Sequence, residues 1–304
     1  MFSQYFGHYL LNRELITREQ LADALEFQAS VHVKFGVIAV DEGNMTPLQV
    51  EEVHEKQKQV DKRFGEIAME LGYLTNEQVE SLVSAQKQSH LFLAQALVDR
   101  GYMTIEQFGN ALNDYKKENS LSDDQFEAIK GGSIEALVEN IFNDKDSSQN
   151  VIFGKYLSLF AKNLIRFVDD AVYLEISGSK GDQGENWLVH QEIIGDSPLF
   201  TAMSTNEEVF LHIASKYAEE ELTEVDELAK ASVSEFLNLH NGIYLVNMSN
   251  WGVELNMKPQ EVLENATVTG DSLLVTVHTS KGSFQLIMSN QPSSITIERQ
   301  TQLA

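Results

Sequence analysis

Glu235, Asn238 and Gly242 are the residues of this chain whose types and spacing could support chemistry. They lie in a long helical pattern, where spacings of i, i+3 and i+7 place them in one surface stripe roughly 60° wide. An amide can accept a hydrogen bond from water and donate one to it without being a nucleophile itself. A glycine inside a helix costs about 0.5–1 kcal/mol relative to alanine. Gly242 therefore indicates either a helix end or a surface that a partner approaches closely.

The helix that carries this stripe is predicted to follow Thr223 as its N-cap and to reach about Ser249. The pattern predicts one apolar face that packs on a sheet. Its members are Val225, Ser232, Phe236, Leu239, Ile243 and Val246. A solvated helix flank also commonly holds Glu and Asn, so spacing alone leaves a structural and a functional interpretation open.

The segments around this helix have the pattern of an α+β domain with an antiparallel sheet and helices on one side. Helices are predicted at 151–168 and 206–220. Strands are predicted at 171–177, 186–194, 199–204, 253–257, 272–278, 283–288 and 295–299. Glycines 178, 181 and 184 lack the Lys-Ser/Thr of a phosphate-binding loop, so they are interpreted as a hairpin turn.

Four copies of one pattern, each 29 residues after the last, occupy the first 115 residues. Each copy has a threonine followed three residues later by a glutamine, at Thr17/Gln20, Thr46/Gln49, Thr75/Gln78 and Thr104/Gln107. This spacing is typical of a capping box at a helix N-terminus. The pattern predicts four helix-turn-helix repeats, in which each unit buries its apolar face against its neighbours.

The polar run 143–150 is interpreted as a linker. The predicted organisation is therefore an all-α repeat domain at 1–120, a helical and polar linker at 121–149, and an α+β domain at 150–304.

Composition narrows the classes of function. The chain has 304 residues and no cysteine, which excludes disulfides and cysteine nucleophiles and is compatible with a reducing compartment. Its net charge of −24 opposes binding to nucleic acid or to anionic membranes. The eight histidines have no metal-binding spacing, so no metal site is expected. No signal peptide or membrane-spanning stretch is visible, and we expect a cytoplasmic protein.

The second half resembles a known family over about residues 151–299. The resemblance is carried by the order of elements and by Glu235-Phe236-Leu237-Asn238, Gly242, Gly252 and Pro259. These features are similar to the chemotaxis phosphatases of the CheC/CheX/FliY group, and to CheX most of all. No second Glu-x-x-Asn lies on the leading helix, which favours the CheX-like type with one site.

The resemblance implies a hydrolase that removes the phosphoryl group from the aspartate of a CheY-like response regulator. By position, Asn238 would orient the attacking water, and Glu235 would pair with the regulator's active-site lysine. Phosphoryl transfer depends on in-line positioning more than on covalent chemistry, which suits these residue types. The resemblance also implies that the regulator supplies the magnesium ion, that this chain has no cofactor of its own, and that its C-terminal domains form a homodimer.

The repeats resemble the N-terminal domain of type II secretion and pilus ATPases, through Arg63-Phe64-Gly65-Glu66-Ile67 and the residues that follow. Some of those domains bind cyclic di-GMP through an arginine and the backbone around the glycine. The resemblance thus implies a nucleotide site at Arg63 and Gly65, with Lys34 and Gly36 at the matching positions of the second copy. A protein-docking platform is the alternative for these repeats.

Three hypotheses follow for the whole chain. The first is an aspartyl-phosphate phosphatase with a targeting or regulatory repeat module. The second is an adaptor that binds response regulators without hydrolysis, because the family usually has Asp or Ser four residues before the glutamate, where this chain has Ala231. The third is a cyclic di-GMP receptor.

Overall fold

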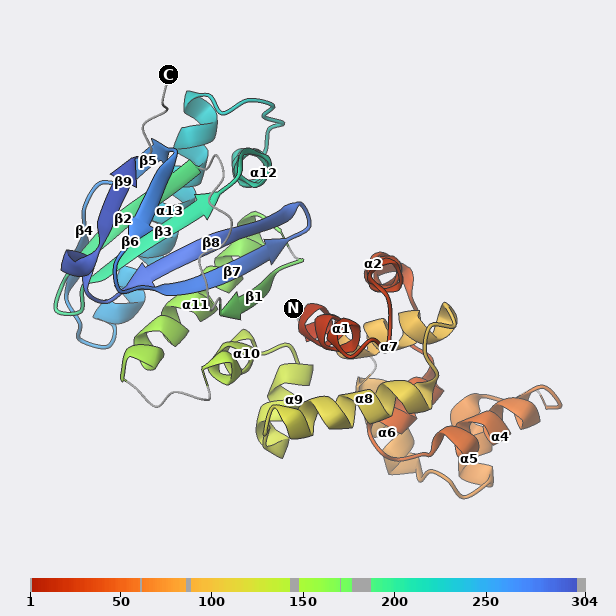
Figure 1. Cartoon of the computed structure of the whole chain (residues 1–304). Coiled ribbons are helices and arrows are strands. Elements are labelled where there is room, and N and C mark those ends of the chain that lie inside the picture. The colour runs from red at the N-terminus through yellow and green to blue at the C-terminus, as the bar shows by residue number, and fades with distance from the viewer. Residues whose placement is uncertain are drawn as a thin grey trace. The chain divides into compact units, whose positions relative to one another are not determined.

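The computed structural model describes residues 2–60, 62–85, 89–142, 148–169, 171–176 and 187–299. The chain forms two compact units, Met1–Leu137 and Val138–Ala304, and Figure 1 labels their elements. The division falls within helix α10 (Ile134–Ile141). The three-part division at residues 120 and 149 stays a prediction. Among the described residues, no helix has the length and apolar content needed to cross a bilayer.

The N-terminal unit consists of short helices. They are α1 (Phe2–Asn12), α2 (Arg18–Phe27), the 3-10 turn η1 (Gln28–Ser30), α3 (Phe35–Asp41), α4 (Pro47–Gln57), α5 (Phe64–Glu70), α6 (Asn76–Ala85), α7 (Ser89–Asp99), α8 (Ile105–Glu118) and α9 (Asp123–Lys130). Capping explains where many of them begin: Thr46 Oγ1 accepts from the Gln49 N–H at 3.3 Å, and Gln49 Oε1 accepts from the Thr46 N–H at 2.7 Å. The other three repeats have the same pair of hydrogen bonds.

The first three repeats share a Phe-Gly pair, at Phe6-Gly7, Phe35-Gly36 and Phe64-Gly65. The glycine of this pair allows the two helices of a repeat to pack closely. A Cβ atom placed on Gly36 would lie 2.6 Å from Val50 Cγ1, and one on Gly7 would lie 2.5 Å from Leu21 Cδ1. In both repeats the contacted side chain lies 14 residues after the glycine. The glycine is therefore explained by helix packing within its repeat.

The first and fourth repeats pack against each other. Helices α1 and α2 contact α7, and α1 contacts α8, where the Phe6 and Phe108 rings lie 5.2 Å apart. Tyr102 also donates a hydrogen bond to Asp23 at 2.8 Å. The repeats therefore depend on contacts between units far apart in the sequence, in addition to the contacts between successive units that the period predicts.

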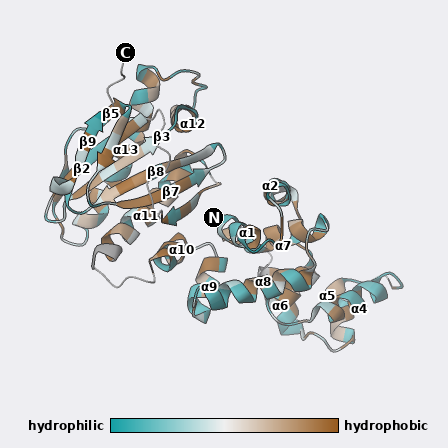
Figure 2. Cartoon of the chain, in the orientation of Figure 1, coloured by the Kyte–Doolittle hydropathy of each residue, from teal (hydrophilic) through white to brown (hydrophobic). Residues whose placement is uncertain are grey.

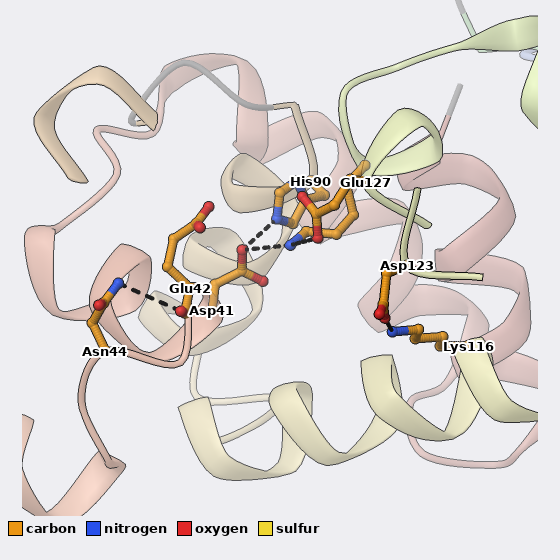
Figure 3. A network of polar contacts seen from close by, with 8 residues as sticks. Asp41, Glu42, Asn44, His90, Lys116, Asp123 and Glu127 are labelled. Atoms are coloured by element: carbon orange, nitrogen blue, oxygen red, sulfur yellow. Dashed lines mark hydrogen bonds and ion pairs between the residues drawn. The ribbon is translucent and has the colours of Figure 1, made fainter. Parts of the chain in front are cut away.

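A buried polar network attaches α9 to the repeats (Figure 3). Asp41 Oδ2 lies 2.8 Å from His90 Nε2 and 3.2 Å from Lys130 Nζ, and all three side chains are almost fully buried. Glu127 also pairs with Lys130, at 3.2 Å. Burial alone would raise the pKa of Asp41, but the hydrogen bond and charge of His90, together with Lys130, outweigh it and hold this pKa below its usual range. A buried charge of this kind is tolerated because it is paired.

The C-terminal unit consists of three long helices and a set of strands that all pair antiparallel. The helices are α11 (Ser148–Phe167), α12 (Glu207–Ala218) and α13 (Glu227–Ser249). The strands and one 3-10 turn are β1 (Tyr173–Ile176), β2 (Trp187–Gly195), β3 (Leu199–Thr205), β4 (Leu255–Met257), β5 (Glu261–Glu264), β6 (Ala266–Thr269), β7 (Leu273–Thr279), β8 (Gly282–Ser289), η2 (Pro292–Ser294) and β9 (Thr296–Arg299). The main sheet has the order β1-β7-β8-β3-β2-β4 with β5 also paired to β2, and β6 pairs with β9 separately.

The helices of this unit cover one face of the main sheet. Phe160 of α11 contacts Phe284 of β8, α12 contacts β8, and α13 contacts β2. The opposite face holds an apolar cluster that includes Leu188, Phe200 and Val268 and brings β6 and β9 against the sheet. Figure 2 shows that β7 and β8 are mainly hydrophobic.

Several sequence predictions for this unit need correction. The N-cap of α13 is Asp226 rather than Thr223, since Asp226 Oδ1 accepts from the Ala229 N–H at 2.8 Å. Val246, predicted to face the sheet, is 62% exposed, whereas Phe236 is buried as predicted.

The structure differs from the sequence predictions in two further ways. The predicted linker 143–150 is helical in its last three residues, because α11 begins at Ser148. Strands β5 and β6 were not predicted, because each has only four residues and depends on pairing with a distant strand. The predicted turn at glycines 178, 181 and 184 lies outside the described residues.

We expect the Gly36→Ala substitution to lower the free energy of unfolding by about 1–3 kcal/mol. The new methyl group would overlap Val50, whose β-branched side chain has one strongly preferred rotamer in a helix. Gly109→Ala is the matched control, because nothing lies within 4 Å of a Cβ atom there, and it should raise stability by about 0.5–1 kcal/mol. Thermal and chemical unfolding of the full chain measure both. Equal effects of the two substitutions would contradict the packing role of Gly36.

We expect Asp41→Asn to destabilise the chain by about 3 kcal/mol at pH 7, because it leaves Lys130 buried without its main counter-ion. The pKa of Asp41 is lowered in the folded state, so its stabilisation is present above an unfolded pKa of about 3.9 and is lost as pH falls below it. The difference between wild type and variant should therefore shrink below about pH 4. The exposed control Asp114→Asn should change stability by less than about 0.5 kcal/mol. A pH-independent difference would contradict this assignment.

Candidate functional site

Helix α13 places the Glu235-Asn238-Gly242 stripe on its flank, at the edge of the face that packs on the sheet. Val233, Phe236 and Leu237 are buried, whereas Glu235 is exposed and Asn238 is half-buried. Asn238 Nδ2 donates to Glu235 Oε2 at 3.2 Å, so the structure brings the two predicted residues into direct contact.

Gly242 lies within α13, which continues to Ser249, so it does not end the helix. A Cβ atom placed on Gly242 would meet Met257 Cε at 3.7 Å, an ordinary contact. Packing within the chain therefore does not require glycine at this position. Because Gly242 has no side chain, the helix backbone one turn beyond Asn238 is open to the close approach of another molecule.

A hydrogen-bonded chain of side chains runs inward from Asn238. Gln191 Nε2 donates to Asn238 Oδ1 at 2.9 Å, and Asn241 Nδ2 donates to Gln191 Oε1 at 2.8 Å. Asn241 Oδ1 in turn accepts from the Tyr156 hydroxyl at 2.7 Å, and Asn241 Nδ2 also donates to Thr201 Oγ1 at 3.1 Å. Burial raises the pKa of Tyr156, so its hydroxyl keeps its proton and donates. The chain links α13 to β2, β3 and α11.

His240 lies behind this chain in the core and is fully buried. Its Nδ1 lies 3.0 Å from Asn163 Nδ2. The His240 and Tyr156 rings pack edge to face, with their centroids 4.5 Å apart. Burial lowers the pKa of His240 to about 3, so the ring is neutral and structural at physiological pH.

Sequence reasoning missed Gln191, Thr201, Asn241 and Tyr156. A signal for Gln191 was present: alternation along β2 places Val189, Gln191 and Ile193 on one face, and Val189 and Ile193 are fully buried. A polar side chain in a buried row needs partners.

The predicted nucleotide-binding residues lie in the N-terminal unit. Arg63 precedes α5 and is exposed, whereas Lys34 precedes α3 and pairs with Asp99 at 2.7 Å. The Phe64 ring lies 3.5 Å from a Cβ atom placed on Gly36, and the Phe35 ring lies 4.0 Å from one placed on Gly65. Side chains therefore fill the space beside both glycines, and nucleotide binding stays a prediction.

Among the described residues, no group of three or more His, Asp and Glu side chains is arranged to hold a metal ion. The structure describes a set of hydrogen-bonding groups on α13: one carboxylate, one oriented amide and a bare backbone position. This set can position a water or a phosphoryl oxygen.

No protein-family model matches the chain, and no curated protein matches it. Similar solved structures carry chemotaxis names, and each is matched over about half of this chain. CheX of Borrelia burgdorferi, solved with CheY, BeF3 and Mg²⁺, is 18% identical, with 49% of this chain and 97% of that chain covered and a TM-score of 0.39. A CheC-like protein of Shewanella sp. PV-4 is 15% identical, with 45% and 95% covered and a TM-score of 0.39. Thermotoga maritima FliY is 14% identical, with 51% and 89% covered and a TM-score of 0.35.

We expect His240 to make folding stability depend on pH between 8 and 5. The neutral ring cannot take a proton in the folded state until about pH 3, whereas the unfolded chain takes one below about pH 6.5, so acid favours unfolding by up to about 1.4 kcal/mol per pH unit. Unfolding free energies of wild type and His240→Gln should therefore converge as pH falls. A constant difference across this range would show that His240 titrates normally.

Proposed function

We propose that this chain hydrolyses the phospho-aspartate of a CheY-like response regulator, with the N-terminal repeats as a targeting or regulatory module. The observation that carries the proposal is the orientation of Asn238, whose amide meets Glu235 at the surface and is held from behind by buried Gln191. The resemblance of Glu235-x-x-Asn238 and its sequence context to the CheX type of chemotaxis phosphatase supports the same reading.

In this reaction a water attacks phosphorus while the bond from phosphorus to the aspartate oxygen breaks, which releases inorganic phosphate and the carboxylate. Gln191 holds Asn238 Oδ1 from the core side, and Asn238 Nδ2 gives one hydrogen to Glu235. The second Nδ2 hydrogen is the group that can orient the attacking water. Such an amide positions the water, and positioning together with electrostatic stabilisation provides most of the catalysis in phosphoryl transfer.

Glu235 supplies a negative charge at the exposed rim of the site. The proposal assigns it to an ion pair with the active-site lysine of the regulator, which would align the phospho-aspartate with Asn238. The regulator also supplies the magnesium ion that stabilises charge on the phosphoryl oxygens. Gly242 leaves room for the regulator's backbone, and the C-terminal units form a homodimer in this proposal.

We expect Asn238→Ala to lower the rate of regulator dephosphorylation on the order of 100-fold, because the water loses its positioning group. The measurement is phosphate release from CheY-like regulators phosphorylated with acetyl phosphate, with the full chain added in catalytic amounts. Asn247→Ala is the matched control, since Asn247 lies on the same helix about 180° away. It should retain the wild-type rate.

Two outcomes would count against the proposal. An Asn238→Ala variant with the wild-type rate would remove Asn238 from the chemistry. Tight binding of a phosphorylated regulator by wild type, without any change in phosphate lifetime, would favour the non-catalytic adaptor.

A further inference from the structure

Gln191 is a buried polar residue whose side chain links Asn238 to Asn241 in the core and to the backbone at Lys258. Its side chain on β2 is 1% exposed. Nε2 donates to Asn238 Oδ1 and to the Lys258 backbone carbonyl, both at 2.9 Å, and Oε1 accepts from Asn241. Both hydrogens of its amide and its acceptor are therefore used.

Two backbone carbonyls determine which way this amide points. A carbonyl oxygen can only accept, so the end of Gln191 that faces the Lys258 carbonyl must be the NH2 group. The same NH2 group faces Asn238, which must therefore present its oxygen.

The Gln191 backbone carbonyl fixes the same amide orientations from the inner end of the hydrogen-bonded network. Thr201 Oγ1 donates its single hydrogen to the Gln191 backbone carbonyl at 3.1 Å, so it must accept from Asn241. Asn241 therefore directs its NH2 group toward Thr201 and toward Gln191 Oε1. The two anchors agree, and none of the three amides can rotate by 180° without placing two donors or two acceptors together.

We propose that Gln191 is a positioning residue that holds Asn238 with its oxygen directed inward and its NH2 group directed toward Glu235. This inference rests on the proposed function for its effect on rate, whereas the orientation itself is independent of any activity. Without Gln191, the half-buried Asn238 side chain could present either end of its amide at the surface. Only one of those orientations places an N–H beside the Glu235 carboxylate.

Gln191→Met tests the proposal, because it keeps the length and volume of the side chain and removes the hydrogen bonds of the side-chain amide. We expect kcat for regulator dephosphorylation to fall about 10-fold per folded molecule while KM for the phosphorylated regulator changes less than 2-fold. Ile193→Ala is the matched control: Ile193 lies two residues further on β2, on the same face, and is fully buried. It should lower thermal stability and leave kcat at the wild-type value.

A second variant covers the case in which Gln191→Met does not fold. Gln191→Glu keeps an acceptor for Asn241 and supplies at most one hydrogen where the amide supplies two. It should show the same fall in kcat. A wild-type kcat in either variant, with Asn238→Ala inactive, would overturn the proposal, as would an equal fall in Ile193→Ala.

A spectroscopic readout separates this inference from the proposed function. The side-chain NH2 signals of Asn238 can be assigned in ¹⁵N–¹H spectra as the pair that Asn238→Ala lacks. Those signals should shift and broaden in Gln191→Met and stay in place in Ile193→Ala. Absence of phosphatase activity in wild type with shifted signals in Gln191→Met would reject the function and keep the orientation, whereas unshifted signals would reject the orientation.

Discussion

The contact of α13 with β2 is the interaction on which the C-terminal unit depends. In this contact Gln191 of β2 meets Asn241 of α13, and both side chains are almost fully buried. Leaving one such buried polar group without a partner costs about 1–3 kcal/mol. The pair therefore penalises any sliding of the helix along the strand, because sliding would leave several donors and acceptors unpaired at once.

The same buried hydrogen bonds also hold Asn238, at the surface end of the network. Asn241 lies one turn beyond Asn238 on the same helix, and Gln191 contacts both. The position of the candidate site is thus set by the same hydrogen bonds that fix the helix on the sheet. Tyr156 and Thr201 extend the network to α11 and β3. Three neighbouring elements, β2, β3 and α11, therefore contribute to the orientation of one half-buried amide.

The N-terminal unit is stabilised mainly by contacts between short helices. Its helices are too short to be stable alone, and each is stabilised by a capped N-terminus and by packing with its neighbours. The contact of the first repeat with the fourth buries apolar surface that a linear stack would leave exposed at its ends. The Asp41–His90–Lys130 network then attaches α9 to this cluster of repeats.

The sequence by itself determined the local features. Capping pairs such as Thr46 and Gln49 specify helix starts within a few residues, and the spacing of Glu235 and Asn238 places them together on any helix. Only the tertiary structure decided which repeats meet, that β5 and β6 exist as strands, and that Gln191 lies against Asn238, 47 residues away. The physical reason is range: capping and helical spacing act over three or four residues, whereas strand pairing and buried hydrogen bonds depend on partners that only the folded chain brings together.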